Sequence, residues 1–267
     1  MKILCPVDFS DSSVNAVDYA LNLFQGQELE VNLVHCFNLA SRSAMFLKMD
    51  EILHSRAEED LETFIGKLSG KYPGVNFSTA IYKGDPKYII PAYESKRDFD
   101  FIVIGTTGMS EVKDLLVGSL TETLFEKSNT PVIAVPKATV AVLPKKLLLA
   151  LDNKPIDSHK VLDPIKLLVE NAHAQLHVCH VEDASGDDDF DPMKYKELDD
   201  FPYEYRLLKE SDDGLSKTIS QYAADINADI LALVHRHRTW WQRLFTKSLS
   251  KEELYHLDTV LLVLNGD

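Results

Sequence analysis

Residues 2–8 read KILCPVD and residues 146–152 read KLLLALD, so a lysine, an apolar run and a closing aspartate recur at an offset of 144. Three more largely apolar runs recur at similar offsets: residues 31–35 with 176–180, 100–104 with 229–233, and 132–135 with 261–264. A repeat at this spacing is typical of two copies of one folding unit. The insertions fall between the matching runs, as expected if each run is one secondary-structure element.

The repeat divides the 267 residues into two domains of ordinary size. We place them at residues 1–139 and 140–267, and we place the bridge between them at residues 137–145, which contain Pro144. With 45% hydrophobic and 26% charged residues, the chain can form folded cores, which argues against global disorder.

Within each copy, short apolar runs alternate with longer segments of helical period, which is typical of α/β proteins. Uninterrupted apolar runs such as residues 101–104 predict strands that are buried on both faces of a parallel sheet. Each copy is therefore expected to be an open, Rossmann-like parallel sheet with helices on both faces. In the first copy the sequence predicts three helices: one capped by Asp11 or Ser12 and ending near Gly26, one over residues 43–68 closed by Ser69 and Gly70, and one opened by Pro86.

The charge of the chain excludes some classes of partner. Against 28 Lys and Arg stand 42 Asp and Glu, which gives a net charge of −14 and disfavours nucleic acid or an acidic membrane surface as a general partner. Residues 182–200 alone hold nine acidic residues against Lys194 and Lys196. We interpret this segment as a solvated loop, with a metal-binding or partner-binding role as the alternative.

The cysteines and the N-terminus indicate the compartment. Cys5, Cys36 and Cys179 lie in apolar runs without the spacing of a disulfide framework, so we expect reduced, packed thiols. The N-terminal apolar run is too short for a signal peptide, and no run approaches the 18 apolar residues that a spanning helix needs. A cytoplasmic protein without a membrane-bound part is therefore expected.

A cluster of glycines follows the apolar run 101–104. Residues 105–108 read GTTG, and nine residues later Gly118 and Ser119 open a predicted helix. In a parallel sheet this loop lies at the carboxyl end of a strand, where such folds bind ligands. Glycines at these positions permit positive φ, and we expect the loop amides, with the helix N-terminus, to cradle an anion. The sequence has no P-loop after a strand and no GxGxxG fingerprint.

The spacing G-x2-G-x9-G-[ST] after an apolar strand, together with Asp8 at the end of the first strand, resembles the ATP-binding members of the universal stress protein family. The repeat extends this resemblance to a tandem form. It implies two HUP-type domains that form a pseudo-dimer, in which residues 132–135 and 261–264 pair within one chain. It also implies an adenine nucleotide as ligand, ATP first with ADP or AMP as alternatives, and it admits a divalent metal such as Mg²⁺ beside the nucleotide.

By the same resemblance, twelve residues would contact the nucleotide. Pro6, Val7 and Asp8 would line the adenosine side, with Asp8 as a hydrogen-bond acceptor, and Val34 would meet the adenine through its backbone. The ribose and phosphates would lie along Gly105, Thr106, Gly108, Met109, Gly118, Ser119, Leu120 and Thr121, where Leu120 replaces the more usual valine. Taken singly, these residues allow a simpler interpretation, in which the glycines serve turns and Asp8 caps a helix.

The second copy lacks the glycine cluster, because Gly105, Gly108 and Gly118 correspond to Val234, His237 and Lys247. A β-branched valine disfavours positive φ, so we predict no nucleotide site there. Gly84 also has no clear counterpart near residues 210–213.

The corresponding loop of the second copy, residues 235–248, is basic and aromatic, and it resembles the loop of family members that do not bind ATP. It could bind an anion, cover the partner domain or dock another protein, or its two tryptophans could pack on their own domain. Seven of the nine histidines lie in this copy, and His177 and Cys179 share one strand face, yet no CxxC or HExxH spacing supports a metal site.

The sequence thus predicts a nucleotide-responsive stress or signalling protein that binds one ATP per chain in its first domain. Little or no hydrolysis is expected and no catalytic residue is assigned, because no base is placed to position an attacking water. Two other classes stay open: an interaction scaffold that acts through residues 235–248, and a metal-dependent enzyme that uses the second-copy histidines. A homodimer of chains and an unidentified protein partner also stay open.

Overall fold

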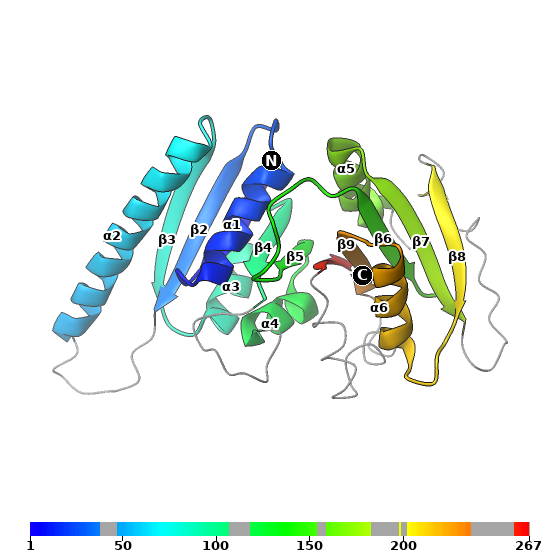
Figure 1. The fold of residues 1–267 in the computed structure, drawn as a ribbon. Coiled ribbons are helices and arrows are strands. Elements are labelled where there is room, and N and C mark those ends of the chain that lie inside the picture. The colour runs from blue at the N-terminus through cyan, green and yellow to red at the C-terminus, as the bar shows by residue number, and fades with distance from the viewer. Residues whose placement is uncertain are drawn as a thin grey trace.

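The computed structural model describes residues 1–37, 47–106, 118–153, 159–182, 198, 202–235 and 259–266. Their strands form one sheet of ten strands in the order β3-β2-β1-β4-β5-β10-β9-β6-β7-β8. Figure 1 shows the two halves of the chain side by side along this sheet, with α2 at one end and β8 at the other.

The first copy forms one half of the sheet. Its elements are β1 (Lys2–Val7), α1 (Asp11–Leu23), β2 (Glu30–Phe37), α2 (Leu47–Lys71), β3 (Asn76–Lys83), α3 (Pro86–Glu94), β4 (Phe101–Gly105), α4 (Ser119–Lys127) and β5 (Val132–Val135). All neighbouring strands within this half are parallel. The chain moves outward from β1 through β2 to β3 and then returns to the other side of β1 with β4, so the strand order reverses between β1 and β4.

The second copy repeats this arrangement. Its elements are β6 (Lys146–Leu151), the 3₁₀ helix η2 (His159–Leu162), α5 (Asp163–Ala172), β7 (Gln175–Glu182), β8 (Tyr203–Lys209), α6 (Leu215–Asp225), β9 (Ile230–His235) and β10 (Val260–Asn265). A matched contact accompanies the matched topology: the Asp100 carboxylate accepts a hydrogen bond from the Lys2 amide at 2.6 Å, and the Asp229 carboxylate accepts one from the Lys146 amide at 2.9 Å. The prediction of two open parallel-sheet domains in tandem is confirmed.

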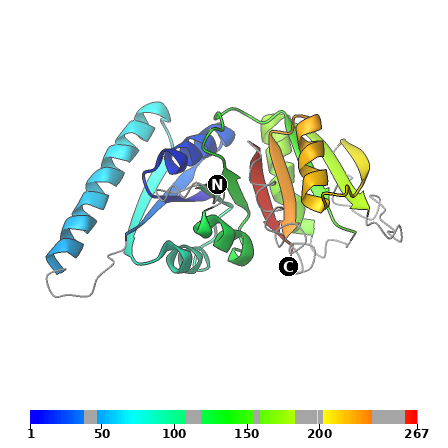
Figure 2. The ribbon, with the colours of Figure 1, turned by 60° about the horizontal axis from the view of Figure 1, so that its bottom comes forward.

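The two halves join through their last strands. β5 and β10 pair antiparallel, with Ile133 opposite Leu262, and Figure 2 shows the red β10 between the green β5 and the orange β9. Side-chain amides add contacts across the junction: Asn265 donates to the Ser128 carbonyl at 3.2 Å, and Asn171 donates to the Leu23 carbonyl at 2.6 Å. The prediction that these strands form a pseudo-dimer within one chain is confirmed, whereas the boundary at residue 139 stays a prediction.

Helices cover both faces of the sheet and create two separate cores. One core contains buried side chains of α1, α2 and α5, and the other contains buried side chains of α3, α4 and α6. β4 is buried along its whole length, as its uninterrupted apolar sequence predicts. Because α1 covers one face of the sheet and α4 covers the other, the carboxyl ends of β1 and β4 lie between these two helices.

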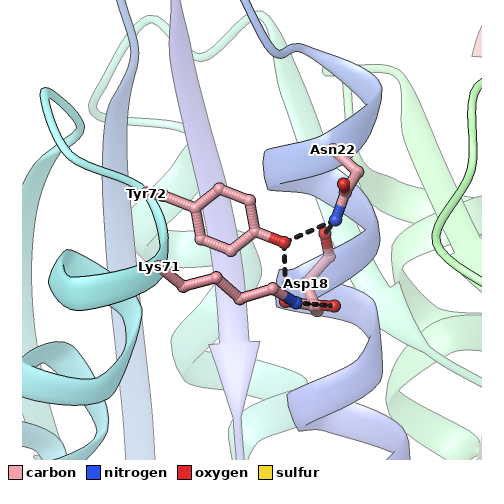
Figure 3. A network of polar contacts seen from close by, with 4 residues as sticks. All are labelled: Asp18, Asn22, Lys71 and Tyr72. Atoms are coloured by element: carbon pink, nitrogen blue, oxygen red, sulfur yellow. Dashed lines mark hydrogen bonds and ion pairs between the residues drawn. The ribbon is translucent and has the colours of Figure 1, made fainter.

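A polar network fastens the end of α2 to α1 (Figure 3). The Tyr72 hydroxyl donates to Asp18 at 2.7 Å, the Lys71 ammonium group donates to the same carboxylate at 2.7 Å, and Asn22 contacts the Tyr72 hydroxyl. Burial is the largest influence on the Tyr72 phenol and, with Asp18 beside it, raises the pKa of Tyr72. The phenol therefore stays protonated and acts as a donor across the neutral pH range.

Several predicted helix boundaries are wrong, each for a local reason. Ser10, rather than Asp11 or Ser12, caps α1, because its hydroxyl accepts the Ser13 amide at 3.3 Å. α2 continues through the exposed Ser69 and Gly70 to Lys71, which with Tyr72 is held by hydrogen bonds to Asp18 of α1. Gly84 also has a counterpart after all: it precedes α3 with φ +140°, and Gly214 precedes α6 with φ +99°.

The three cysteines are free, and Cys5 and Cys179 are buried as expected, whereas Cys36 is half-buried. Burial raises the pKa of each thiol to about 12, with Asp85 as a second cause at Cys36. No helix in the described part of the chain is long and apolar enough to cross a membrane.

Candidate functional site

A cavity of about 300 Å³ opens at the carboxyl ends of β1, β2 and β4, where the strand order reverses. This is the position at which open α/β sheets bind their ligands. Nine of the twelve residues predicted from the sequence line it: Pro6, Val7, Asp8, Val34, Gly105, Gly118, Ser119, Leu120 and Thr121. The structure therefore brings together residues from four separate segments of the first copy.

The other three predicted residues are placed differently. Thr106 does not line the cavity but is buried beside it, and its carbonyl accepts a hydrogen bond from the Gly118 amide at 2.5 Å. This contact ties the end of β4 to the start of α4. Gly108 and Met109 lie outside the described residues.

The cavity also has walls that the sequence did not identify, formed by Ser13, Cys36, Pro86, Ile90 and Ile104. Cys36 lies two residues after Val34, so both side chains are on the same face of β2. The alternation of side chains along a strand could have predicted this from the sequence. Pro86 and Ile90 lie one helical turn apart on α3, a relation visible in the sequence once α3 is known to cover this face. Their approach to β1 and β4 is a tertiary contact that no local sequence pattern predicts.

Asp8 follows β1 and shapes the turn into α1. Its Oδ1 accepts hydrogen bonds from the Ser10 amide at 3.1 Å and from the Ser10 hydroxyl at 2.6 Å. Ser10 in turn caps α1, so Asp8 supports the cap without being the cap itself. The carboxyl group lies in the cavity wall, where it can also face a ligand.

Gly105 is required for close packing rather than for a turn. Its φ is not positive, and a Cβ at this position would lie 2.4 Å from Ser12 Oγ and 2.7 Å from the Ser12 carbonyl oxygen. The positive φ that a glycine permits is therefore not used here. The missing side chain allows the first turn of α1 to contact the end of β4, which closes one side of the cavity.

Gly118 is the N-cap of α4 and also has an ordinary backbone conformation, with φ −62° and ψ 143°. A Cβ would lie 3.3 Å from the Thr106 carbonyl oxygen, which is tight but tolerable. Whereas Ser10 caps α1 and Asp85 caps α3 with their side chains, no side chain caps α4. The first-turn amides of α4 are therefore directed at the cavity with the positive end of the helix dipole.

The second copy differs at the corresponding positions. Val234 is a buried residue of β9 and carries a side chain where the first copy has none. Positive φ is not the reason for this difference, because Gly105 does not adopt it. Asp152, the counterpart of Asp8, is 7% exposed and thus buried, whereas Asp8 is half-buried. The absence of a second nucleotide site stays a prediction.

The second copy has three other candidate features: its histidines, the basic loop 235–248 and the acidic segment 182–200. His177 is buried with its Nδ1 3.6 Å from a Glu204 carboxylate oxygen, and the described residues contain no group of three or more His, Cys, Asp or Glu that could hold a metal. Of the basic loop 235–248 only His235 is described, and of the acidic segment 182–200 only Glu182 and Leu198 are described. The interpretations of both segments thus concern residues that lie almost wholly outside the described part of the chain.

The parallel strand order within each half defines a doubly wound α/β protein, and the cavity lies at the reversal point of its first half. The model of the universal stress protein family matches residues 1–136, about half of the sequence, and the chain belongs to this family. Universal stress protein MJ0531 of Methanocaldococcus jannaschii is 28% identical over 141 residues, 51% of this chain and 82% of that protein. YxiE of Bacillus subtilis is 27% identical over 144 residues, 50% of this chain and 97% of that protein.

A solved structure shares the fold over the full length. The universal stress protein from Archaeoglobus fulgidus superposes with a TM-score of 0.74 at 23% identity and covers 100% of this chain and 97% of its own. The tandem arrangement of two domains is therefore a known form of this fold.

Proposed function

We propose that this universal stress protein binds one adenine nucleotide, ATP in the first instance, in the cavity of its first domain. The observation that carries the proposal is the start of α4, which has no side-chain cap and lies in the wall of an otherwise mainly apolar cavity. An uncapped helix N-terminus is a ready site for phosphate. The protein would respond to stress through its nucleotide state.

The walls of the cavity match the parts of a nucleotide. Val34, Ile90 and Ile104 are buried aliphatic residues that line it and suit a flat, apolar base. Asp8 supplies a carboxylate for ribose hydroxyl groups, and the backbone of residues 119–121 supplies amides for the phosphates, since the Gly118 amide donates to the Thr106 carbonyl. The volume of about 300 Å³ lies at the lower end of the range for ligand pockets.

The charges of the cavity bear on how the phosphates are held. Among the described residues that line the cavity, Asp8 is the only carboxylate and none is Lys or Arg. We propose that backbone amides and the dipole of α4 contribute to phosphate binding. We propose that Mg²⁺ accompanies the nucleotide, because it neutralises phosphate charge that would otherwise repel Asp8.

We further propose that the bound ATP is held rather than turned over. Asp8 is the one carboxylate among the lining residues that the structure describes, and its Oδ1 already accepts two hydrogen bonds from Ser10. A general base must be within hydrogen-bond reach of the attacking water, and an oxygen so engaged is a poor candidate.

Titration of the purified protein with ATP in a calorimeter, with and without Mg²⁺, tests this function. We expect saturable binding of ATP that is tighter with Mg²⁺, and we expect adenine nucleotide in an acid extract of protein purified without added ligand. A protein that yields no nucleotide on extraction and gives no heat of binding with ATP, ADP or AMP would refute the proposal.

A further inference from the structure

Phe9 has a backbone conformation that bulky residues rarely adopt. It follows Asp8 in the turn between β1 and α1, and its φ is +61°. The left-handed region is disfavoured for residues with a Cβ, and for a large aromatic residue such a φ is an outlier that the surroundings must enforce. The contacts around Phe9 must therefore stabilise this turn.

Two neighbouring elements hold Phe9 in place. Its ring centroid lies 4.9 Å from the His35 ring of β2 and 6.4 Å, edge to face, from the Phe64 ring of α2. His35 is itself anchored, because its Nδ1 lies 2.8 Å from the Val7 carbonyl oxygen. The ring of Phe9 is thus wedged against the same core that α1 and α2 cover.

The consequence of the turn appears at Asp8. Ser10 folds back so that both its amide and its hydroxyl reach Asp8 Oδ1, and the Asp8 amide donates to Ser13 Oγ at 3.4 Å. Asp8 and Ser13 both line the cavity. The conformation at Phe9 therefore decides where the carboxylate of Asp8 sits relative to a ligand.

The second copy provides an internal comparison. There Asp152 is followed by Asn153, which does not share the positive φ, although asparagine adopts that region more readily than phenylalanine. The histidine contact is retained, with His180 Nδ1 2.8 Å from the Leu151 carbonyl oxygen. The strand and the histidine thus do not by themselves impose the left-handed turn, which the first copy has at Phe9 and the second copy lacks at Asn153.

We propose that Phe9 is a positioning residue for ligand binding: its wedged ring holds the β1–α1 turn in a left-handed conformation that orients Asp8 into the cavity before the nucleotide arrives. This inference rests on the proposed nucleotide-binding function. It assigns the ring a role in affinity that acts through Asp8, in addition to its contribution to packing.

A double-mutant cycle tests the inference. Phe9→Ala removes the ring but keeps the Cβ that disfavours the left-handed region, so the turn should leave that region, and we expect the affinity for ATP to fall about tenfold, within the range of couplings between residues that act together. In an Asp8→Ala background the same change should cost less than about twofold, because the group that Phe9 positions is gone. Phe9→Tyr keeps the ring and should restore most of the affinity.

Controls separate positioning from general destabilisation. Phe77→Ala removes another half-buried ring from the same core, at β3 and away from the turn, so it should lower the melting temperature without weakening ATP binding. Equal losses of affinity for Phe9→Ala with and without Asp8, no loss at all, or a loss equal to that of Phe77→Ala would overturn the inference while leaving nucleotide binding intact. A wild-type protein that binds no ATP would overturn the proposed function, and the inference with it.

Discussion

Gly105→Ala is expected to destabilise the protein and to abolish ATP binding. The new Cβ would lie 2.4 Å from Ser12 Oγ and 2.7 and 2.8 Å from the Ser12 backbone oxygen and carbon. The side chain of Ser12 could rotate, but its backbone belongs to the first turn of α1 and must move as a unit. Overpacking of this kind costs about 1–3 kcal/mol, or more where backbone must shift.

The displacement would also reach the cavity, because α1 begins next to the turn that holds Asp8. Urea unfolding and ATP calorimetry on the same preparation measure the two effects together. Gly66→Ala is a matched control, since a Cβ at this position in α2 meets nothing within 4 Å. That change should stabilise the protein by about 0.5–1 kcal/mol through helix propensity. A Gly105→Ala protein as stable as the wild type would show that the contact with Ser12 relaxes freely.

Gly118→Val should separate binding from folding. Valine accepts the backbone conformation at this position, φ −62° and ψ 143°, and its Cβ would be 3.3 Å from the Thr106 carbonyl oxygen. The free energy of unfolding should therefore fall by no more than about 1 kcal/mol. The two methyl groups would stand at the N-terminus of α4, where we place the phosphates, and prevent their approach to the amides.

We expect the affinity for ATP to fall at least about a hundredfold, which corresponds to about 2.7 kcal/mol. Gly118→Ala, with one carbon instead of three, should give an intermediate loss of affinity. A graded loss would show that the side chain keeps the phosphates away from the α4 amides, rather than that the variant is generally destabilised. Calorimetry with ATP and with adenosine completes the comparison, because adenosine lacks the phosphates and should lose far less. Unchanged ATP affinity in the valine variant would mean that the phosphates do not lie over α4.

The repeat of apolar runs ending in Asp8 and Asp152 was enough to predict the fold, because strand-helix alternation and the match between copies leave few topologies for a parallel sheet. The pairing of β5 with β10 was predicted from the resemblance to the universal stress protein family rather than from the repeat itself. Helix ends were less predictable: Ser10, Asp11 and Ser12 are all good caps, and only the hydrogen bonds of the folded turn show that Ser10 is used.

The candidate site was predictable to the extent that its residues follow strands or open helices. Asp8, Gly105 and Gly118 each stand at such a junction, and topology then brings them together. The sequence could not show why residue 105 must lack a side chain, because Ser12, which lies against it, is far away along the chain. The contributions of Cys36 and Ile90, and the left-handed turn at Phe9, likewise depend on packing between elements.

We propose that the two copies of one fold have diverged so that only the first holds a nucleotide. Native mass spectrometry of the 30.1 kDa chain with saturating Mg²⁺ and ATP counts bound nucleotides per chain directly. We predict one ATP per chain, with no second adduct as the concentration of ATP rises, and loss of that one adduct in Gly118→Val. Two ATP molecules per wild-type chain, or none, would contradict the account.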